Sequence, residues 1–243
     1  MLSKNELKYT QSLCHKKHRD AEKLFIAEGP KLAEEILKSD FEIKQVYATN
    51  QWLQSHPSLT VPVTEISETE LSRISNLQTP NEVFIIARQK LPGKEPVLPD
   101  NITLVLDGIQ DPGNFGTIIR IADWFGIKQI VASEASVEVY NPKVVQSTVG
   151  SICRVEVWYK DLPPWISEIS IPVYGALLAG QNVYALKNIK EGLLIIGNES
   201  KGIGTPLKLK ITHPVTIPKT GEAESLNAAV AAGIIVGCMV NNF

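Results

Sequence analysis

Six short and strongly apolar segments recur in the second half of the chain, and they restrict its fold more than any other feature. The segments lie at 102–108, 128–133, 153–159, 171–179, 192–197 and 213–218. Several are apolar along almost their whole length, which is typical of strands that are covered on both faces. Their alternation with loops and helix-like stretches predicts an α/β fold with a mostly parallel sheet, whose ligands lie beyond the carboxyl ends of the strands.

A second, smaller α/β layer precedes these segments. Its strand-like stretches lie at 24–29, 43–49, 61–66 and 83–89. Helix-like stretches lie between them, one of which begins with the capping pair Ser67 and Glu70. Residues 91–100 contain three prolines and one glycine without any periodicity, as a domain linker does. We therefore predict an N-terminal domain at 1–90, a linker at 91–100 and a C-terminal domain at 101–243.

The composition indicates a protein with substantial cores and without a membrane segment. The chain has 243 residues, of which 44% are hydrophobic, enough for two domains. The longest apolar stretch, 228–240, is too short to span a bilayer, and the first residues lack the apolar run of a signal peptide. Three widely spaced cysteines, Cys14, Cys153 and Cys238, fit a reducing compartment. We therefore expect a cytoplasmic protein.

Metal binding is not expected. Cys14 has two histidines close to it, but no second Cys or His pair follows that would complete a tetrahedral zinc site. A polar, exposed arm accounts for this cluster.

Positive charge is concentrated at the N-terminus, although the whole chain carries a net charge of −2. Residues 1–31 contain seven basic and four acidic side chains, a local charge of +3. The overall charge argues against coating nucleic acid by bulk electrostatics, so that any such contact is local. Lys16, Lys17 and Arg19 are the candidate phosphate contacts, and a solvated helix face is the alternative interpretation.

A polar loop follows the first strand of the C-terminal domain. Asn114 lies at the start of a predicted helix whose apolar stripe includes Ile118 and Ala122. Arg120 lies about 200° around this helix from Ile118 and therefore faces away from the core, where it could meet a phosphate. In the alternative interpretation Asn114 is the helix N-cap and Arg120 forms a surface ion pair.

Two further loops follow apolar strands. The glycine spacing of the loop that carries Gly197 and Gly202 matches neither the dinucleotide fingerprint nor the P-loop. Glu199 in this loop could orient a hydroxyl group, or be a solvated turn residue. The last loop leads through residues 225–227 into a helix of small side chains, where Ser225 is the predicted N-cap and free helix amides suit a polar ligand.

Together, DPGNFGTIIR, GNESKGIG and IP followed by ESLNAAVAAG resemble the three ordered motifs of SpoU/TrmH-type RNA methyltransferases of the SPOUT superfamily. The resemblance extends to YNPKVVQSTVGSICRV at 140–155 and to the HKKHRDAEKLFIAEG opening. It implies a C-terminal SPOUT domain with a deep trefoil knot, an exception to the rule that chains avoid knots. It further implies a small N-terminal α/β substrate-binding domain, S-adenosylmethionine as cofactor, and a homodimer in which one subunit contributes to the active site of the other.

The resemblance also implies roles for individual residues. Cofactor contacts are expected from Leu177, Leu178, Gly197, Gly202, Ile217 and Leu226. The polar positions of the active site are matched by Asn114, Arg120, Glu199, Ser225 and Asn227. Arg120 is expected to hold the phosphate beside the target ribose while the others align its hydroxyl. A guanidinium stays protonated in proteins, so Glu199 or solvent is the expected proton acceptor.

The expected activity is the transfer of a methyl group to a ribose 2'-hydroxyl of RNA. Ribosomal RNA is favoured over transfer RNA because the N-terminal domain resembles those of rRNA-modifying members. The alternatives are a tRNA 2'-O-methyltransferase, a catalytically silent RNA-binding protein of the same fold, and another nucleotide-using α/β enzyme that acts on a small molecule. The complete set of polar residues counts against the silent protein.

Overall fold

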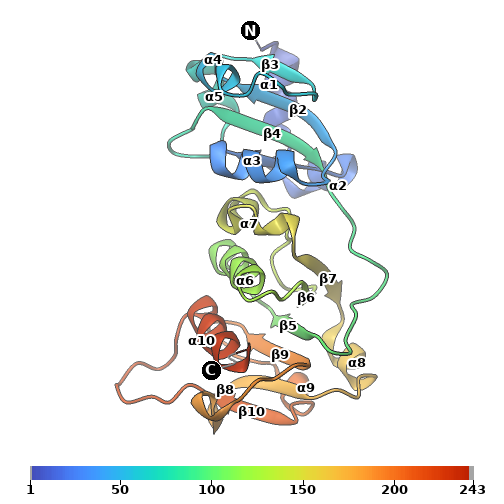
Figure 1. Cartoon of the computed structure of the whole chain (residues 1–243), viewed down its shortest axis with the longest axis vertical. Coiled ribbons are helices and arrows are strands. Elements are labelled where there is room, and N and C mark those ends of the chain that lie inside the picture. Colours follow the sequence, from blue (N-terminus) through green and yellow to red (C-terminus); the bar gives the residue numbers. More distant parts are fainter. Residues whose placement is uncertain (1, 241–243) are drawn as a thin grey trace. The chain divides into compact units, whose positions relative to one another are not determined.

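The computed structural model describes residues 2–240 and divides the chain into two compact units (Figure 1). The first unit consists of the chain up to Leu91 together with Tyr140–Cys153. The second consists of Pro92–Val139 together with the chain from Arg154 onwards. The segment 140–153 therefore groups with the first unit, although it lies inside the range 101–243 that the sequence assigned to the C-terminal domain.

The first unit is built on a four-stranded sheet in the order β1-β4-β2-β3. Strand β4 runs antiparallel to both of its neighbours, and β2 runs parallel to β3. The elements of this unit are α1 (Lys4–Ser12), α2 (Lys16–Glu22), β1 (Leu24–Glu28), α3 (Pro30–Lys38), β2 (Ile43–Ala48), α4 (Asn50–Gln54), β3 (Val63–Glu65), α5 (Glu68–Ile74), β4 (Val83–Arg88), α7 (Pro142–Thr148) and the 3-10 turn η1 (Ser151–Cys153).

Strand β1 has buried side chains on both of its faces. Leu24 and Ile26 belong to a core that also includes residues of α5. Phe25 points to the opposite face, where the ring of Tyr140 lies 4.9 Å from its own. The Tyr140 hydroxyl donates to the carbonyl oxygen of Lys90 and accepts from its amide, both at 2.9 Å, and burial raises the pKa of Tyr140 to about 12. These contacts tie the segment 140–153 to the first unit.

The second unit is built on a six-stranded sheet in the order β10-β8-β9-β5-β6-β7, in which all strand pairs are parallel. This confirms the predicted α/β fold with a mostly parallel sheet. The elements are β5 (Ile102–Asp107), α6 (Pro112–Trp124), β6 (Gln129–Ser133), β7 (Glu156–Lys160), α8 (Leu162–Ser167), β8 (Val173–Asn182), the 3-10 turn η2 (Val183–Ala185), β9 (Gly192–Gly197), α9 (Thr205–Lys208), β10 (His213–Thr216) and α10 (Ala228–Val240).

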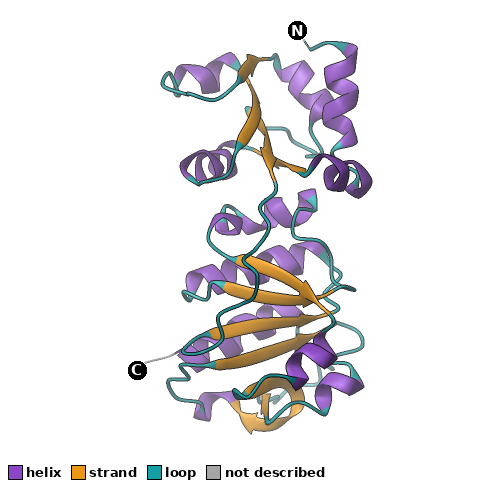
Figure 2. Ribbon diagram, turned by 90° about the vertical axis from the view of Figure 1, so that its right-hand side faces the viewer, coloured by secondary structure: helices purple, strands orange, loops and turns teal. Residues whose placement is uncertain are grey.

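Helices cover both faces of this second sheet (Figures 1 and 2). On one face, Leu162 of α8 and Leu207 of α9 pack in one core with Val105 and Ile195 of the central strands. On the other face α6 and α10 lie side by side, and Gly233 of α10 leaves room for Ile121 of α6. Because both faces are buried, polar chemistry in this unit is confined to the strand ends.

Strand β8 departs from regular pairing with β10. Tyr174 and Gly175 pair with the first residues of β10, and pairing resumes only at Gln181, so that 176–180 form an excursion from the ladder. A Cβ atom at Gly180 would lie closer than 3.0 Å to the backbone of Pro214, so only glycine fits there. The excursion contains two of the predicted cofactor residues.

Two features are absent from residues 2–240. No helix among them is long and apolar enough to cross a membrane. Over the same range, no three His, Cys, Asp or Glu side chains are grouped so that they could hold a metal ion.

Candidate active site

The three loops that the sequence singled out all leave the same edge of the second sheet. In a parallel sheet the carboxyl ends of neighbouring strands lie together. Strand β5 pairs with β9 so that Asp107 lies opposite Gly197, at the last residue of each strand. The loops after these two strands therefore start next to one another, and the loop after β10 leads back to α10, which packs against α6.

A chain of hydrogen bonds joins three polar residues from these loops. The Asn114 amide nitrogen Nδ2 donates to Glu199 Oε1 at 2.7 Å. The Asn227 Nδ2 donates to Asn114 Oδ1 at 2.9 Å. The partners are 85 and 113 residues apart in sequence, so the fold itself brings them together. Glu199 is half-buried and hydrogen-bonded, which rules out the interpretation of a freely solvated turn acid.

The start of helix α10 sets the orientation of this chain of hydrogen bonds. Asn227 Oδ1 accepts from the backbone amides of Ala229 and Val230 at 3.0 and 3.2 Å, so Asn227 is the N-cap. With its oxygen held by the helix, only its Nδ2 can face Asn114, and the Asn114 Nδ2 must then face Glu199. The N-cap thus orients the Asn114 amide so that it donates a hydrogen bond to Glu199.

One prediction about a helix start was wrong, and one alternative interpretation of a helix start does not hold. Ser225 was the predicted N-cap of the last helix, but the helix starts at Ala228 and Asn227 caps it. Similarly, Asn114 does not cap α6: Asp111 does, by accepting from the Asn114 backbone amide at 2.7 Å. Each true cap has a short polar side chain that sits directly before its helix. This leaves the Asn114 side chain available for Glu199.

The glycine loop after β9 is folded tightly onto itself. Asn198 and Gly202 form an isolated antiparallel bridge, with both backbone amides donating to the opposite carbonyl at 3.1 and 2.8 Å. A Cβ atom at Gly197 would lie closer than 3.0 Å to the backbone of Gly202 and Ile203. Gly202 itself has a φ of +67°, which favours glycine. Both backbone polar groups of Gly202 are thus used within the loop.

Residues that the sequence reasoning missed hold this loop against the end of β5. Asn198 Nδ2 donates to the carbonyl of Gly108 at 2.8 Å, and its Oδ1 accepts from the amides of Ser200 and Lys201, both at 3.0 Å. Asp107 Oδ2 accepts from the Gly204 amide at 2.7 Å. In both cases the signal available in the sequence was a polar residue at the end of an apolar strand.

The predicted cofactor residues present main-chain groups and apolar side chains at this edge. Leu177 is half-buried against the core, whereas Leu178 is 83% exposed and Leu226 47% exposed. The Thr216 hydroxyl donates to the carbonyl of Leu178 at 3.2 Å, which places Ile217 next to the excursion of β8. Exposed leucines beside close-packed glycine backbone fit a ligand with a flat, apolar and hydrogen-bonding ring system, such as the adenine of S-adenosylmethionine.

Arg120 and Ser225 are not joined to the cluster. Both are exposed, and within residues 2–240 neither side chain forms a hydrogen bond or ion pair, so the alternative of a surface ion pair for Arg120 does not hold. Arg120 follows Asn114 by six residues on α6, which places it roughly 120° around the helix from Asn114. Within one chain, Arg120 therefore projects away from the Asn114 amide.

The predicted RNA contact of Arg19 is wrong. Its side chain is only 1% exposed, and its guanidinium donates to the carbonyl oxygens of Leu13 and Cys14 at 2.9 and 2.7 Å. Arg19 therefore holds the turn between α1 and α2 and has no surface to offer to a phosphate. Lys16 and Lys17 are exposed, and Lys16 forms an ion pair with Asp20 one turn further along α2.

Comparisons with known proteins cover both units. Residues 101–237 match the model of the SpoU rRNA Methylase family, and residues 4–85 match the MRM3-like substrate binding domain. The chain is 31% identical over 240 residues, 96% of each chain, to the 23S rRNA (guanosine(2553)-2'-O)-methyltransferase RlmP of Bacillus subtilis.

Solved structures of similar proteins share the whole fold. A TrmH-family protein from Porphyromonas gingivalis has a TM-score of 0.86 and 37% identity, over 98% of each chain. An AdoMet-bound rRNA methyltransferase from Sinorhizobium meliloti has a TM-score of 0.86 and 29% identity, over 98% of this chain and 95% of that one. The match to the family model spans more than half of the chain and contains the hydrogen-bonded cluster. The chain therefore belongs to the SpoU rRNA methylase family.

Proposed function

We propose that this protein transfers a methyl group from S-adenosylmethionine to a ribose 2'-hydroxyl of ribosomal RNA. The observation that carries the proposal is the hydrogen-bonded chain of Asn114, Glu199 and Asn227 at the carboxyl edge of the second sheet. The Bacillus subtilis relative, named a 23S rRNA 2'-O-methyltransferase, supports RNA of the large ribosomal subunit as the substrate. The Sinorhizobium meliloti protein, similar over nearly the whole chain, supports the cofactor.

The residues at the sheet edge have the chemistry to hold this cofactor. When bound, S-adenosylmethionine supplies a methyl group on a sulfonium, a leaving group that needs no further activation. Main-chain groups of Leu177, Leu178 and Ile217 and the side chain of Leu226 would hold the adenine, and the close-packed Gly197 and Gly202 would shape the wall of the site. Much of the rate enhancement then comes from positioning.

Glu199 is the group best placed to orient the attacking hydroxyl. Its Oε1 is held by Asn114, while its Oε2 has no hydrogen-bond partner within residues 2–240. An ionised carboxylate accepts hydrogen bonds only, so Oε2 can take the bond that the 2'-hydroxyl donates. As the oxygen attacks, its proton passes to Glu199 or to solvent. Asn114 and Asn227 keep the carboxylate oriented, and Ser225 lines the approach of the ribose.

Arg120 reaches the site in our proposal through a homodimer. Trp124 lies one turn after Arg120 on the same face of α6 and is 84% exposed, and Val230 of α10 is half-exposed. A second copy of the chain that covers Trp124 would bury an exposed apolar surface. Arg120 is then carried to the partner's site, where its guanidinium holds the phosphate next to the target ribose.

Three further parts of the proposal concern organisation. The first is the deep trefoil knot in the second unit that the resemblance implies. The second is the division of roles: residues 1–90 recognise RNA, residues 91–100 link the two domains, and residues 101–243 carry out methyl transfer. The segment 140–153 anchors the C-terminal domain to the first unit. Lys16 and Lys17 are proposed as phosphate contacts in a cytoplasmic protein.

Methyl transfer from tritiated S-adenosylmethionine tests this function. We expect label in ribosomal RNA taken from cells that lack the gene, and none in RNA from cells that have it. The label must survive alkaline hydrolysis within a dinucleotide, because a 2'-O-methyl group blocks cleavage at that position. Label in transfer RNA alone would favour the tRNA alternative, and no label in any RNA would favour the silent RNA-binding protein.

A further inference from the structure

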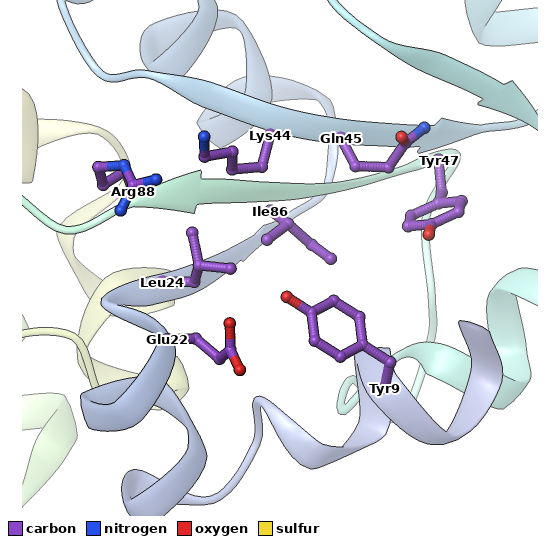
Figure 3. A pocket seen from close by; sticks show the side chains of 8 residues that line it. All are labelled: Tyr9, Glu22, Leu24, Lys44, Gln45, Tyr47, Ile86 and Arg88. Carbon is purple, nitrogen blue, oxygen red and sulfur yellow. The ribbon is translucent and has the colours of Figure 1, made fainter. Parts of the chain in front are cut away.

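The first unit contains an open pocket on one face of its sheet, outside the site described above. The pocket has a volume of about 350 Å³, within the range of small-molecule sites. Helices α1 and α2 form one side, and strands β1, β2 and β4 form the floor and the other side (Figure 3). It is lined by Tyr9, Glu22, Leu24, Lys44, Gln45, Tyr47, Ile86 and Arg88.

Two phenol groups lie across an apolar floor. Leu24 and Ile86 form the floor, the Tyr9 hydroxyl points toward it from α1, and Tyr47 lies to the side on β2 (Figure 3). Tyr47 is mostly buried and Tyr9 is 40% exposed, and within residues 2–240 neither hydroxyl has a hydrogen-bond partner. Burial raises the pKa of both phenols, so both stay neutral and can donate as well as accept. Both hydroxyls line the open pocket, where they are available to a ligand with polar edges.

The rim combines cations with a carboxylate. Arg88 Nε donates to Glu42 at 2.6 Å, and Lys44 also contacts Glu42, but the terminal nitrogens of Arg88 form no bond among the described residues. These donors suit a phosphate. Glu22 at the end of α2 points into the pocket beside Tyr9 and has no hydrogen-bond or ion-pair partner in the described part of the chain. An anion bound inside the pocket would be repelled by it, which excludes a free phosphate as the main ligand.

We propose that this pocket binds an unpaired guanine nucleotide of the RNA substrate, distinct from the nucleotide that is methylated. Proteins recognise single-stranded RNA bases by packing them against aromatic side chains and by forming hydrogen bonds to the polar edges of the bases. Guanine has two adjacent donors, N1–H and the 2-amino group, which match the two oxygens of Glu22. Its O6 accepts from a phenol hydroxyl, and its phosphate meets Arg88. The inference deepens the proposed function, because it rests on RNA being the substrate.

Other bases match the carboxylate less well. Adenine and cytosine each bring one amino group, and neither places a second donor next to it in its neutral form. Uracil brings only N3–H. The hydrogen-bond donors of guanine thus match the two oxygens of Glu22 better than those of the other bases. We therefore expect a preference for guanine that is set by Glu22 and not by the basic rim, since phosphates are common to all four nucleotides.

Binding of short oligoribonucleotides to the full chain tests the proposal. The probes are fluorescent single-stranded hexamers of uridine that contain one central guanosine, inosine or uridine, measured by anisotropy. Inosine lacks the 2-amino group and so loses one of the two bonds to Glu22. We expect wild type to bind the guanosine probe roughly 10-fold more tightly than the inosine probe. Glu22→Gln, whose amide disrupts the paired acceptors, should remove this preference.

Matched variants separate a recognition role from a folding role. Glu34→Gln changes an exposed carboxylate on α3 of the same unit, and should keep the guanosine preference. Tyr47→Phe removes only a hydroxyl and should weaken guanosine binding several-fold with an unchanged Tm. Equal binding of all three probes by wild type, or an intact preference in Glu22→Gln, overturns the proposal. Methyl transfer to ribosomal RNA by wild type is measured alongside, so that loss of the enzymatic function is recognised separately.

Discussion

The two sheets of this chain leave polar groups accessible in different places. The second sheet is buried on both faces, and its accessible polar groups lie in loops at the carboxyl ends of its strands. The first sheet has an open pocket on one face, where side chains of the strands themselves are accessible. A site built from loops at strand ends depends on the backbone conformation of those loops, whereas a site on the face of a sheet depends on individual side chains. We therefore expect substitutions in the second unit to change turnover, and those in the first unit to change RNA affinity or folding.

The largest effect is expected for Gly197→Ala in the second unit. The new Cβ atom would meet the backbone of Gly202 and Ile203, which cannot move away without breaking the bridge between Asn198 and Gly202. We expect no measurable methyl transfer and a loss of about 2–3 kcal/mol in the free energy of unfolding. Calorimetric binding of S-adenosylmethionine and denaturant unfolding measure the two effects. Gly93→Ala is the control and should behave as wild type, because its new Cβ atom would make only an ordinary contact, 3.9 Å from the end of the Glu156 side chain.

Arg120→Ala should lower the rate of methyl transfer by roughly 10²–10³-fold, as expected for loss of a preorganised charged donor. The affinity for S-adenosylmethionine should change little, since Arg120 is exposed and, within residues 2–240, forms no hydrogen bond with the predicted cofactor residues. Steady-state kinetics with ribosomal RNA and calorimetry check both parts. Lys208→Ala on α9 removes an exposed cation from the opposite face of the sheet. An Arg120 variant as active as the Lys208 variant would refute the assignment.

In the first unit, Arg19→Ala should act on stability. The buried guanidinium satisfies two carbonyl groups at the turn between α1 and α2, and its loss leaves both unpaired. We expect a loss of about 2–3 kcal/mol in unfolding free energy, measured by urea titration. The exposed neighbour Lys17→Ala should leave stability unchanged and weaken RNA binding slightly. An Arg19 variant of normal stability but poor RNA binding would restore the original prediction from the sequence.

A smaller effect is expected for Asn227→Ser. Serine keeps the cap of α10, but its shorter side chain has no amide nitrogen to bond Asn114 Oδ1, so the orientation of the hydrogen-bonded chain is lost while the helix start is retained. We expect turnover to fall by roughly 10-fold, the effect of one lost hydrogen bond of about 1.4 kcal/mol. Asn227→Ala should show the same loss of turnover and cost about 1 kcal/mol of stability in addition. Equal turnover of wild type and the serine variant would exclude this positioning role.

Much of the fold could be predicted because local patterns agree with it. The predicted strands 24–29, 43–49 and 83–89 correspond to β1, β2 and β4, and both Ser67 and Glu70 form the expected capping box. The apolar run 192–197 coincides with β9. Side-chain periodicity and capping are properties of short segments, and a single sequence displays them directly.

The parts that could not be predicted depend on contacts distant in sequence. Nothing near Arg19 distinguishes it from Lys17, and only the turn that closes over it makes it a buried residue. The same holds for Tyr140, whose hydroxyl binds Lys90 and draws its segment into the first unit. Ser225 and Asn227 are both good caps, so composition alone could not decide where α10 begins. The motifs indicated that Asn114 and Glu199 share a site, but not that one donates to the other.

Single-turnover methyl transfer to ribosomal RNA by Glu199→Gln shows whether this carboxylate acts on the ribose hydroxyl. We expect a rate at least about 100-fold below wild type, because the amide offers one acceptor less to the ribose hydroxyl and cannot take its proton. The affinity for S-adenosylmethionine and the Tm should remain as in wild type, and Glu156→Gln, at the amino end of β7, should remain active. A Glu199→Gln variant that methylates as fast as wild type would show that Glu199 does not act on the ribose hydroxyl.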